Sequence, residues 1–243
     1  MANLVAVDNK SHQKVRIDIS KLAMHGASLH MVPVIVPEFS NAAGQYPIVL
    51  TKKVDTGEFT FIALLGFEAG ENLFWKKGEW QGLYLPLQIR RQPFFIGNPT
   101  ENSQTISVSD DHIVCIDSQS PAVTTNQGMP LFDERGLDTE YFQEAKACLA
   151  HILMGEEENK ALIENLQTMD LLQPMSLKIT FINQKSTQLN GLYTIDKAKF
   201  SKLTDEQVLQ LHTLGLLGAI HSLMTSLAQI QTLIDLKNQR LTD

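Results

Sequence analysis

The spacing of apolar residues changes near Pro130 in this chain, and that change limits the folds it can adopt. Before Pro130, short β-branched and aromatic runs alternate with polar turns, which is typical of antiparallel strands. After it, apolar residues recur at helical intervals around one further pair of strand-like runs. Strands followed by helices predict the α+β class, with a mainly antiparallel sheet from the N-terminal half packed by C-terminal helices. We expect residues 1–243 to form a single domain of this class.

The first half is predicted to contain one edge strand and three antiparallel strand pairs. In the run 29–39, Pro33 and Pro37 cannot donate ladder hydrogen bonds, so this run is expected at a sheet edge or as an extended arm. The three pairs flank polar turns: 46–53 with 58–66 across Val54-Asp55-Thr56-Gly57, a short hairpin at 75–80, and 106–108 with 113–117 across Ser109-Asp110-Asp111.

Helical spacing and helix-end signals dominate the second half. A helix over 141–154 is expected to end at Gly155, and a second helix is expected from Glu156 to about Met169, with Pro174 as a stop. Two strands within 175–193 are expected to add to the first sheet. Thr204 and Gln207 match a capping box, which predicts a helix from there to about Leu214.

The last segment has apolar residues at alternating steps of four and three. This spacing is that of a heptad seam, but the seam is shorter than a safe coiled-coil assignment requires. Two interpretations follow: the seam packs on the protein's own sheet, or it forms a homodimer or binds a partner helix. The seam residues are Leu216, Ile220, Leu223, Leu227, Ile230 and Ile234.

Composition and charge exclude several classes of protein. The chain is 43% hydrophobic and 19% charged, as in globular proteins, and its net charge of −7 disfavours nucleic acid as the main partner. No run approaches the roughly 20 apolar residues of a membrane span. The first 20 residues have no signal-peptide pattern, so we expect a cytoplasmic protein. Cys115 and Cys148 lie among apolar neighbours and are expected to be buried structural thiols.

No motif identifies a catalytic group, a metal or a cofactor. None of the seven histidines is followed two residues later by a carboxylate, and HExxH and phosphate-loop patterns are absent. Cys148 and His151 share one face of a predicted helix, but their apolar neighbours favour core packing. We therefore expect no metal and no cofactor, and the catalytic residues are unknown.

One aromatic and basic stretch is the candidate binding site. Arg90 and Arg91 lie between Tyr84 and Phe94, and adjacent guanidinium groups can bind a carboxylate or a peptide main chain. Trp75 and Trp80 are expected to line a neighbouring groove, since aromatic and Arg residues are enriched at binding hot spots. The alternative is that one arginine pairs with Glu68 or Glu71, the other is solvated, and the aromatic side chains are core.

Several phrases in this order resemble the SapC family, which is associated with bacterial surface-layer proteins. The resemblance extends over about 24–235, and residues 1–22 and 237–243 are peripheral to it. The phrases are YPIVL (46–50), ALLGFEAGENLFW (63–75), YLPLQIRRQPF (84–94), GMPLFDERG (128–136), MDLLQPMSLKITF (169–181) and LNGLYTIDKAKFSKLTDEQVLQLHTLGLL (189–217).

The resemblance implies context and no chemistry, because the family has no established activity or catalytic residues. It implies a non-catalytic accessory protein that recognises a protein or peptide linked to surface-layer or cell-envelope biogenesis. The alternative is a peptide-modifying or envelope-modifying enzyme, metal-dependent or not, with a site built from scattered residues. A third interpretation is a structural subunit that associates through the heptad seam.

Overall fold

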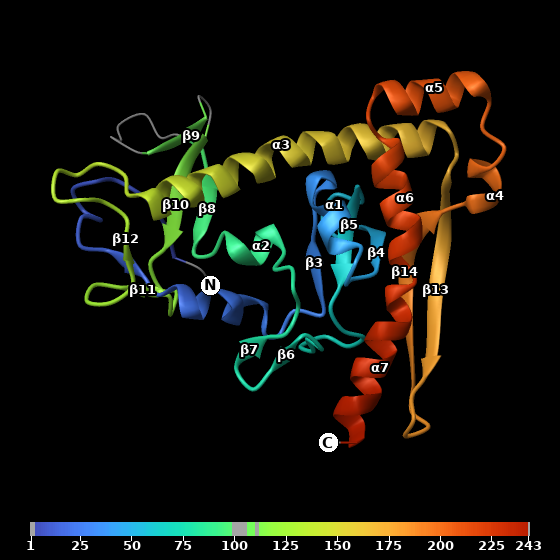
Figure 1. Cartoon of the computed structure of the whole chain (residues 1–243), viewed down its shortest axis with the longest axis horizontal. Coiled ribbons are helices and arrows are strands. Elements are labelled where there is room, and N and C mark those ends of the chain that lie inside the picture. Colours follow the sequence, from blue (N-terminus) through green and yellow to red (C-terminus); the bar gives the residue numbers. More distant parts are fainter. Residues whose placement is uncertain (1–2, 99–105, 110–111, 243) are drawn as a thin grey trace. The chain divides into compact units, whose positions relative to one another are not determined.

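The computed structural model describes residues 3–98, 106–109 and 112–242 (Figure 1). The chain divides into two compact units, each made of two segments. The first unit contains Met1–His25 and Leu87–Met154, and the second contains Gly26–Pro86 and Gly155–Asp243. Both units combine antiparallel strands with helices, so the α+β prediction is confirmed. The single-domain assignment stays a prediction, and each unit is described by itself.

The first unit contains two small antiparallel sheets. One has the order β1-β10-β8, with β9 also paired to β10, and the other has the order β11-β2-β12. The predicted pairing of 106–108 with 113–117 is confirmed by β9 and β10, while Asp110 and Asp111 of the expected turn lie outside the described residues. The strands are β1 (Leu4–Ala6), β2 (Arg16–Ile17), β8 (Phe94–Gly97), β9 (Ser107–Ser109), β10 (His112–Asp117), β11 (Val123–Thr124) and β12 (Met129–Pro130).

Apolar side chains from these strands meet the N-terminal half of the long helix α3 (Glu140–Thr168) in one core. Phe142 is the central aromatic, with ring centroids 5.6 Å from Phe94 and 5.3 Å from Phe132. The short elements η1 (Ile19–Gly26) and α2 (Leu87–Arg90) complete this part of the chain. The core residues are Val7, Ile17, Phe94, Val114, Ile116, Ala122, Leu131, Phe132, Phe142 and Leu149.

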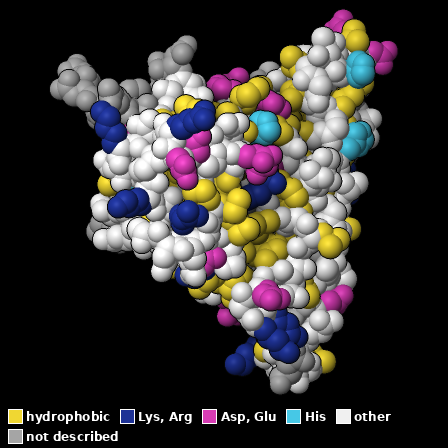
Figure 2. All heavy atoms as spheres, turned by 60° about the vertical axis from the view of Figure 1, so that its left-hand side comes forward, with side chains coloured by type: hydrophobic (Ala, Val, Ile, Leu, Met, Phe, Trp, Pro, Cys, Tyr) yellow, Lys and Arg dark blue, Asp and Glu magenta, His cyan; other side chains and the backbone are white. Residues whose placement is uncertain are grey.

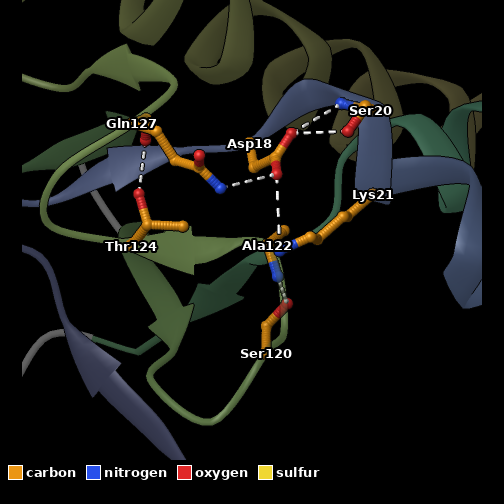
Figure 3. A network of polar contacts seen from close by, with 7 residues as sticks. All are labelled: Asp18, Ser20, Lys21, Ser120, Ala122, Thr124 and Gln127. Atoms are coloured by element: carbon orange, nitrogen blue, oxygen red, sulfur yellow. Dashed lines mark hydrogen bonds and ion pairs between the residues drawn. The ribbon is translucent and has the colours of Figure 1, made fainter.

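A polar network anchors the loops of the three-stranded sheet (Figure 3). The Asp18 carboxylate accepts hydrogen bonds from the Ser20 hydroxyl at 2.6 Å and from Gln127 Nε2 at 3.4 Å, and it lies 3.4 Å from the Lys21 ammonium. The Asp18 amide donates to the Ala122 carbonyl at 2.8 Å. These contacts, led by the one from Ser20, lower the pKa of Asp18, so its charge supports the loop down to acidic pH.

The second unit is built on a five-stranded antiparallel sheet with the order β13-β14-β4-β5-β3. Strands β4 (Ile48–Lys52) and β5 (Phe59–Leu64) pair as the predicted hairpin, and Gly57 has the positive φ of 73° that its turn needs. The largest fully buried side chains of this unit line the sheet and its flanking turns: Ile35, Phe39, Tyr46, Ile48, Leu50, Phe61, Leu64 and Leu65.

The expected edge strand is present but shorter than predicted. Only β3 (Met31–Pro33) pairs at the edge, and η2 (Val36–Glu38) and α1 (Phe39–Ala42) follow it. Pro37 fits the start of a helical turn because its fixed φ is helical and its missing N–H would have no partner there. The buried Glu38 carboxylate accepts the Ile35 N–H at 3.1 Å, which stabilises the change from strand to turn.

The strand pair predicted within 175–193 joins the same sheet, as expected. Strands β13 (Leu172–Thr180) and β14 (Ser186–Ile195) form a hairpin, and β14 pairs with β4. Pro174 is not a helix stop; it lies inside β13, where an outermost strand tolerates the missing donor. Helix α3 ends instead at Thr168, and Asp170 follows with a φ of 53° that permits a bond from Leu171 N to Leu166 O at 2.8 Å.

The prediction that a helix ends at Gly155 is wrong. Helix α3 is continuous for 29 residues from Glu140 to Thr168. Gly155 is buried, and a Cβ there would lie 2.4 Å from the Ile35 Cδ1 atom. Glycine is therefore present because the helix passes so close to Ile35 that no side chain fits.

Four shorter helices follow the sheet: α4 (Lys197–Phe200), α5 (Asp205–Thr213), α6 (Leu217–Ser226) and α7 (Gln229–Thr242). The capping box is confirmed, since Thr204 Oγ1 accepts the Gln207 N–H and Gln207 Oε1 accepts the Thr204 N–H. Gly215, with a φ of 71°, follows α5. Within the described residues no single helix has the length and apolar character of a membrane span; α5 with Leu217–Thr242 meets both criteria only as a pair bent by 97°.

The heptad seam lies along α6 and α7. Leu216, Ile220 and Leu223 are buried, and α6 contacts α1, β4 and β14, so the first half of the seam packs within its own unit. Leu227 lies between α6 and α7, and Ile230 and Ile234 are half-buried. The homodimer stays a prediction.

Candidate functional site

The predicted site residues fall into two groups. Arg90, Arg91 and Phe94 belong to the first unit, and Trp75, Trp80 and Tyr84 belong to the second.

Arg91 is committed to internal contacts. Its Nε donates to Gln88 Oε1 at 2.7 Å, its Nη1 donates to the Phe94 carbonyl at 2.6 Å, and its guanidinium lies 4.2 Å from the Phe95 ring centroid. Burial lowers the pKa of Arg91, and the nearby Cys148 raises it. The partners of Arg91 in these contacts are neutral groups, and the alternative that one of the two arginines pairs with Glu68 or Glu71 stays a prediction.

Arg90 is exposed and lines a groove of about 420 Å³ along α3. Leu22 and Phe94 form part of the wall, and α3 contributes Tyr141, Cys148 and His151 from one helical face. Burial, and then the neighbouring Cys148 and Glu144, raise the pKa of Tyr141, so its phenol stays protonated. A guanidinium, a phenol, a thiol and an imidazole thus line one groove.

The two cysteines are both free. Cys148 is buried, as expected, whereas His151 beside it is exposed. Cys115 is half-buried rather than fully buried, and burial raises the pKa of its thiol. A thiol with a raised pKa is a weak nucleophile at neutral pH, so Cys115 is a packing residue.

A serine–histidine pair in the first unit, with Ser120 buried and His25 half-buried, has no signal in the sequence. His25 Nε2 and Ser120 Oγ are 3.1 Å apart, although the residues are 95 positions apart. Burial lowers the pKa of His25, and the Arg91 charge adds to that effect while Asp117 opposes it. Ser120 Oγ also accepts the Ala122 N–H at 3.2 Å, and the Asp117 carboxylate accepts the amides of Asn3 and Gln119. The pair therefore braces a loop rather than presenting a nucleophile.

The two tryptophans of the second unit are cross-strand neighbours in a hairpin whose turn consists of two residues, Lys77 and Gly78. Strand β6 (Trp75–Lys76) pairs with β7 (Glu79–Trp80), with Trp75 opposite Trp80, so the predicted short hairpin is confirmed. Lys77 and Gly78 have positive φ values of 54° and 85°, which such a tight turn needs. Both tryptophans are half-buried, so each has one surface in the core and one available for contact.

Tyr84 holds the segment after this hairpin in place. Its carbonyl accepts the hydroxyl of Tyr46 and, at 3.3 Å, the Nε1–H of Trp80. Its own hydroxyl donates to Glu38 Oε1 at 2.8 Å. Burial raises the pKa of Tyr46, which keeps that hydroxyl a donor. Tyr84 is therefore a positioning residue for the neighbouring surface.

That surface is a groove of about 690 Å³ between the β6–β7 hairpin and helix α7, here called the α7 groove. Its apolar lining includes Leu73, Phe74, Trp75 and Leu236, and Leu83 stands at its margin with 98% of its surface exposed. Its charged lining consists of Lys76, Lys77 and Arg240. In Figure 2, Lys and Arg side chains gather at the lower end of the view, with Asp and Glu side chains beside them.

Charged contacts fix the two walls of the α7 groove to each other. Arg240 Nη2 donates to the carbonyls of Asn72 at 3.0 Å and Trp75 at 2.8 Å. One turn earlier on α7, the Lys237 ammonium lies 2.5 Å from the Glu71 carboxylate. The groove is thus pre-formed rather than dependent on a ligand to assemble it.

Comparison with known families shows to which family the chain is related. The SapC family model matches residues 7–233. The chain belongs to the SapC family. Neither the curated proteins nor the solved structures contain a match to it.

The SapC match extends further toward the N-terminus than the resemblance in the sequence indicates, since it begins at residue 7. Two of the phrases that resemble the family end or begin beside the α7 groove: 63–75 ends at Trp75, and 84–94 begins at Tyr84. The sequence has no signal for α7 as one groove wall, because residues 237–243 are peripheral to the resemblance. Arg240 in that stretch is what joins α7 to the hairpin.

Metal chemistry has no assembled site in the part of the SapC chain that the structure describes. No group of three or more His, Cys, Asp or Glu side chains there is placed to hold an ion. A third groove, of about 380 Å³, lies between the β4–β5 hairpin and α3, and its lining mixes Lys52, Lys53 and Lys160 with Glu58, Glu156 and Glu164. These mixed charges favour no single ligand class.

Proposed function

We propose that this SapC protein is a non-catalytic accessory protein that binds a segment of another protein in the α7 groove. The partner is a protein linked to bacterial surface-layer or cell-envelope biogenesis. The observation that carries the proposal is the apolar and aromatic lining of a pre-formed groove, with Leu83 98% exposed at its margin. The family association supports the choice of partner, and it does so by context.

An exposed apolar patch beside aromatic side chains favours a protein partner. Leu83 shares the groove lining with Trp75 and Leu236, so a partner that covers it gains the roughly 2 kcal/mol that burying such a side chain contributes. Trp75 lies in the same lining, and tryptophan is among the residues that contribute most to binding at interfaces. The volume of about 690 Å³ holds several side chains of an extended or helical segment.

The arginine pair contributes less to this proposal than the sequence suggests. Arg91 is occupied by Gln88 Oε1 and the Phe94 carbonyl, so its role is to hold α2 and β8. Arg90 is exposed in the first unit and remains a proposed contact there, together with Phe94. We further propose that the protein acts in the cytoplasm, and that self-association through the seam is the alternative to a different partner.

The test is capture of the partner with and without an intact groove. The tagged chain is purified from its native host, and proteins that co-purify are quantified for wild type, Leu83→Asp and Val54→Asp. Val54, at the β4–β5 turn, is 105% exposed and lies outside the α7 groove, so it is a matched control. We expect a stoichiometric envelope-linked protein with wild type and Val54→Asp, and at least a tenfold loss with Leu83→Asp. Equal recovery with all three forms contradicts the groove assignment.

The second candidate function is a peptide-modifying or envelope-modifying enzyme. The observation that favours it is the groove along α3, where Cys148 and His151 lie together with Tyr141 and Arg90. A thiol near an imidazole and a guanidinium is the usual setting for a reactive cysteine. If a small molecule or peptide is consumed by the purified chain and Cys148→Ser abolishes the turnover, the enzyme interpretation replaces the accessory one.

A further inference from the structure

The chemistry of the bound segment follows from the lining of the α7 groove, and this inference rests on the proposed function. We infer that the segment is acidic: it carries carboxylates next to a bulky apolar side chain. The groove lining is cationic, the neighbouring acids are paired or lie outside it, and its floor is apolar.

The charge of the lining is opposite to that of the chain. Lys76, Lys77 and Arg240 are its charged members, and no Asp or Glu belongs to it among the described residues. The chain as a whole has a net charge of −7. A cationic groove on an acidic protein attracts a segment of negative charge and repels a basic one.

Acids near the groove are either paired with a cation or lie outside its lining. Glu71 is paired with Lys237 at 2.5 Å, and Asp235 on α7, which accepts a hydrogen bond from the neutral Gln231 at 2.9 Å and keeps its charge, is not part of the lining. Glu79 lies opposite Lys76 in the β6–β7 register, so it offsets part of the Lys76 charge. Lys77 at the turn and Arg240 on the opposite wall therefore contribute most of the uncompensated positive charge.

The floor of the groove selects an apolar anchor beside those carboxylates. Leu73 and Phe74 are buried, Trp75 and Leu236 are half-buried, and together they form a surface on which an aliphatic or aromatic side chain can pack. Arg240 Nη2 donates to two main-chain carbonyls, which holds its guanidinium in the groove lining. The arrangement fits an apolar side chain flanked by Asp or Glu.

The experiment measures binding of three synthetic peptides to the full chain by fluorescence anisotropy. The peptides are about twelve residues long, share the same Leu and Trp positions, and carry Glu, Gln or Lys at all other positions. We expect the Glu peptide to bind about tenfold more tightly than the Gln peptide and the Lys peptide to bind most weakly. We expect added salt to weaken the Glu peptide most, because exposed charges are screened.

Two pairs of variants show whether the groove lysines cause this preference. Lys76→Gln with Lys77→Asn removes both charges, and Asn tolerates the positive φ of 54° at position 77. The matched control is Lys52→Gln with Lys53→Gln on the β4–β5 hairpin, which lines a different groove. We expect the first pair to weaken the Glu peptide about fivefold to tenfold and the control pair less than about twofold.

Failure of this inference is distinct from failure of the proposed function. If the Glu and Lys peptides bind equally and Leu83→Asp weakens both, the groove binds segments but does not select acidic ones, and the inference is overturned. If none of the peptides binds, or Leu83→Asp changes no affinity, both the inference and the groove assignment are overturned.

Discussion

The ammonium group of Lys237 lies 2.5 Å from the carboxylate of Glu71, a residue 166 positions earlier in the chain. Lys237 is only 9% exposed, and its ammonium also lies 3.7 Å from Glu68 and 5.6 Å from the Phe181 ring centroid. Glu71 in turn accepts the Phe67 N–H at 3.0 Å. Helix α7 is thus attached to the segment before β6 by a largely buried charge pair.

Replacing Lys237 by Met is expected to destabilise the second unit by about 2 to 4 kcal/mol, because it leaves the Glu71 carboxylate buried without its cation. Urea unfolding measures the change. The double variant Lys237→Met with Glu71→Gln is expected to recover part of the loss, since a glutamine oxygen can still accept the Phe67 N–H. If the double variant is no more stable than the single one, the charge pair is not the cause.

Gly155→Ala is expected to destabilise the protein by about 1 to 3 kcal/mol, although alanine is the better helix former. The reason is steric, because the new Cβ would lie 2.4 Å from Ile35 Cδ1 and 2.7 Å from Ile35 Cβ. Gly218 on α6 is the matched control: nothing lies within 4 Å of a Cβ there, so Gly218→Ala is expected to stabilise by about 0.5 to 1 kcal/mol. Thermal unfolding of both variants checks the opposite signs.

Asn159→Ala is expected to cost about 2 to 4 kcal/mol, because it leaves two buried main-chain groups without a partner. Asn159 Oδ1 accepts the Val36 N–H at 2.8 Å, and its Nδ2 donates to the Val34 carbonyl at 3.1 Å. Asn165→Ala on the same helix is the control, since Asn165 is half-buried and bonds to the nearby Ala161 carbonyl and Gln210. If urea unfolding shows equal losses of stability for the two variants, the hydrogen bonds of Asn159 with the main chain of Val34 and Val36 are not the cause of the loss.

Stability is expected to fall as the pH drops from about 7.5 to 5.5, and His25 is the group responsible. Burial lowers the pKa of His25 from its ordinary value of 6.5, so the unfolded chain binds the proton more readily than the folded one. The stabilisation is present above that ordinary value and is lost as the pH falls through the folded pKa. The carboxylates with lowered pKa, Asp8 and Asp18, titrate at more acidic pH and stay charged in this window.

The variant His25→Gln tests this assignment, because a glutamine amide can bond to the Ser120 hydroxyl without titrating. Urea midpoints at pH 7.5 and 5.5 are compared for wild type and variant. We expect the variant to lose less stability between the two values. An identical loss in both would assign the pH dependence to another group.

The sequence predicts those features that depend on neighbouring residues. The turn at Gly57, the capping box of Thr204 and Gln207, and the hairpin at Trp75 and Trp80 are all local patterns, and the structure contains each of them. The edge position of Pro33 follows in the same way from its missing donor. The antiparallel α+β arrangement could therefore be derived without any long-range information.

Features that depend on distant residues could not be derived. Gly155 looks like a helix end until Ile35 is known to pack against it. Arg91 looks available until the Phe94 carbonyl and the Phe95 ring are placed around it. The α7 groove needs Arg240 beside Trp75, a pairing across 165 positions for which the sequence has no periodicity or motif.

The order of strands has a consequence for how the chain is synthesised. Strand β14 pairs with β4, Leu192 opposite Thr51 and Tyr193 opposite Leu50, so one side of β4 acquires its neighbour only after the whole of 87–154 has been made. Until β14 leaves the ribosome, the nascent chain presents an open, apolar strand edge, the kind of edge that pairs with other chains. A chain truncated before residue 186 thus lacks the strand that covers this edge of β4 and is expected to aggregate.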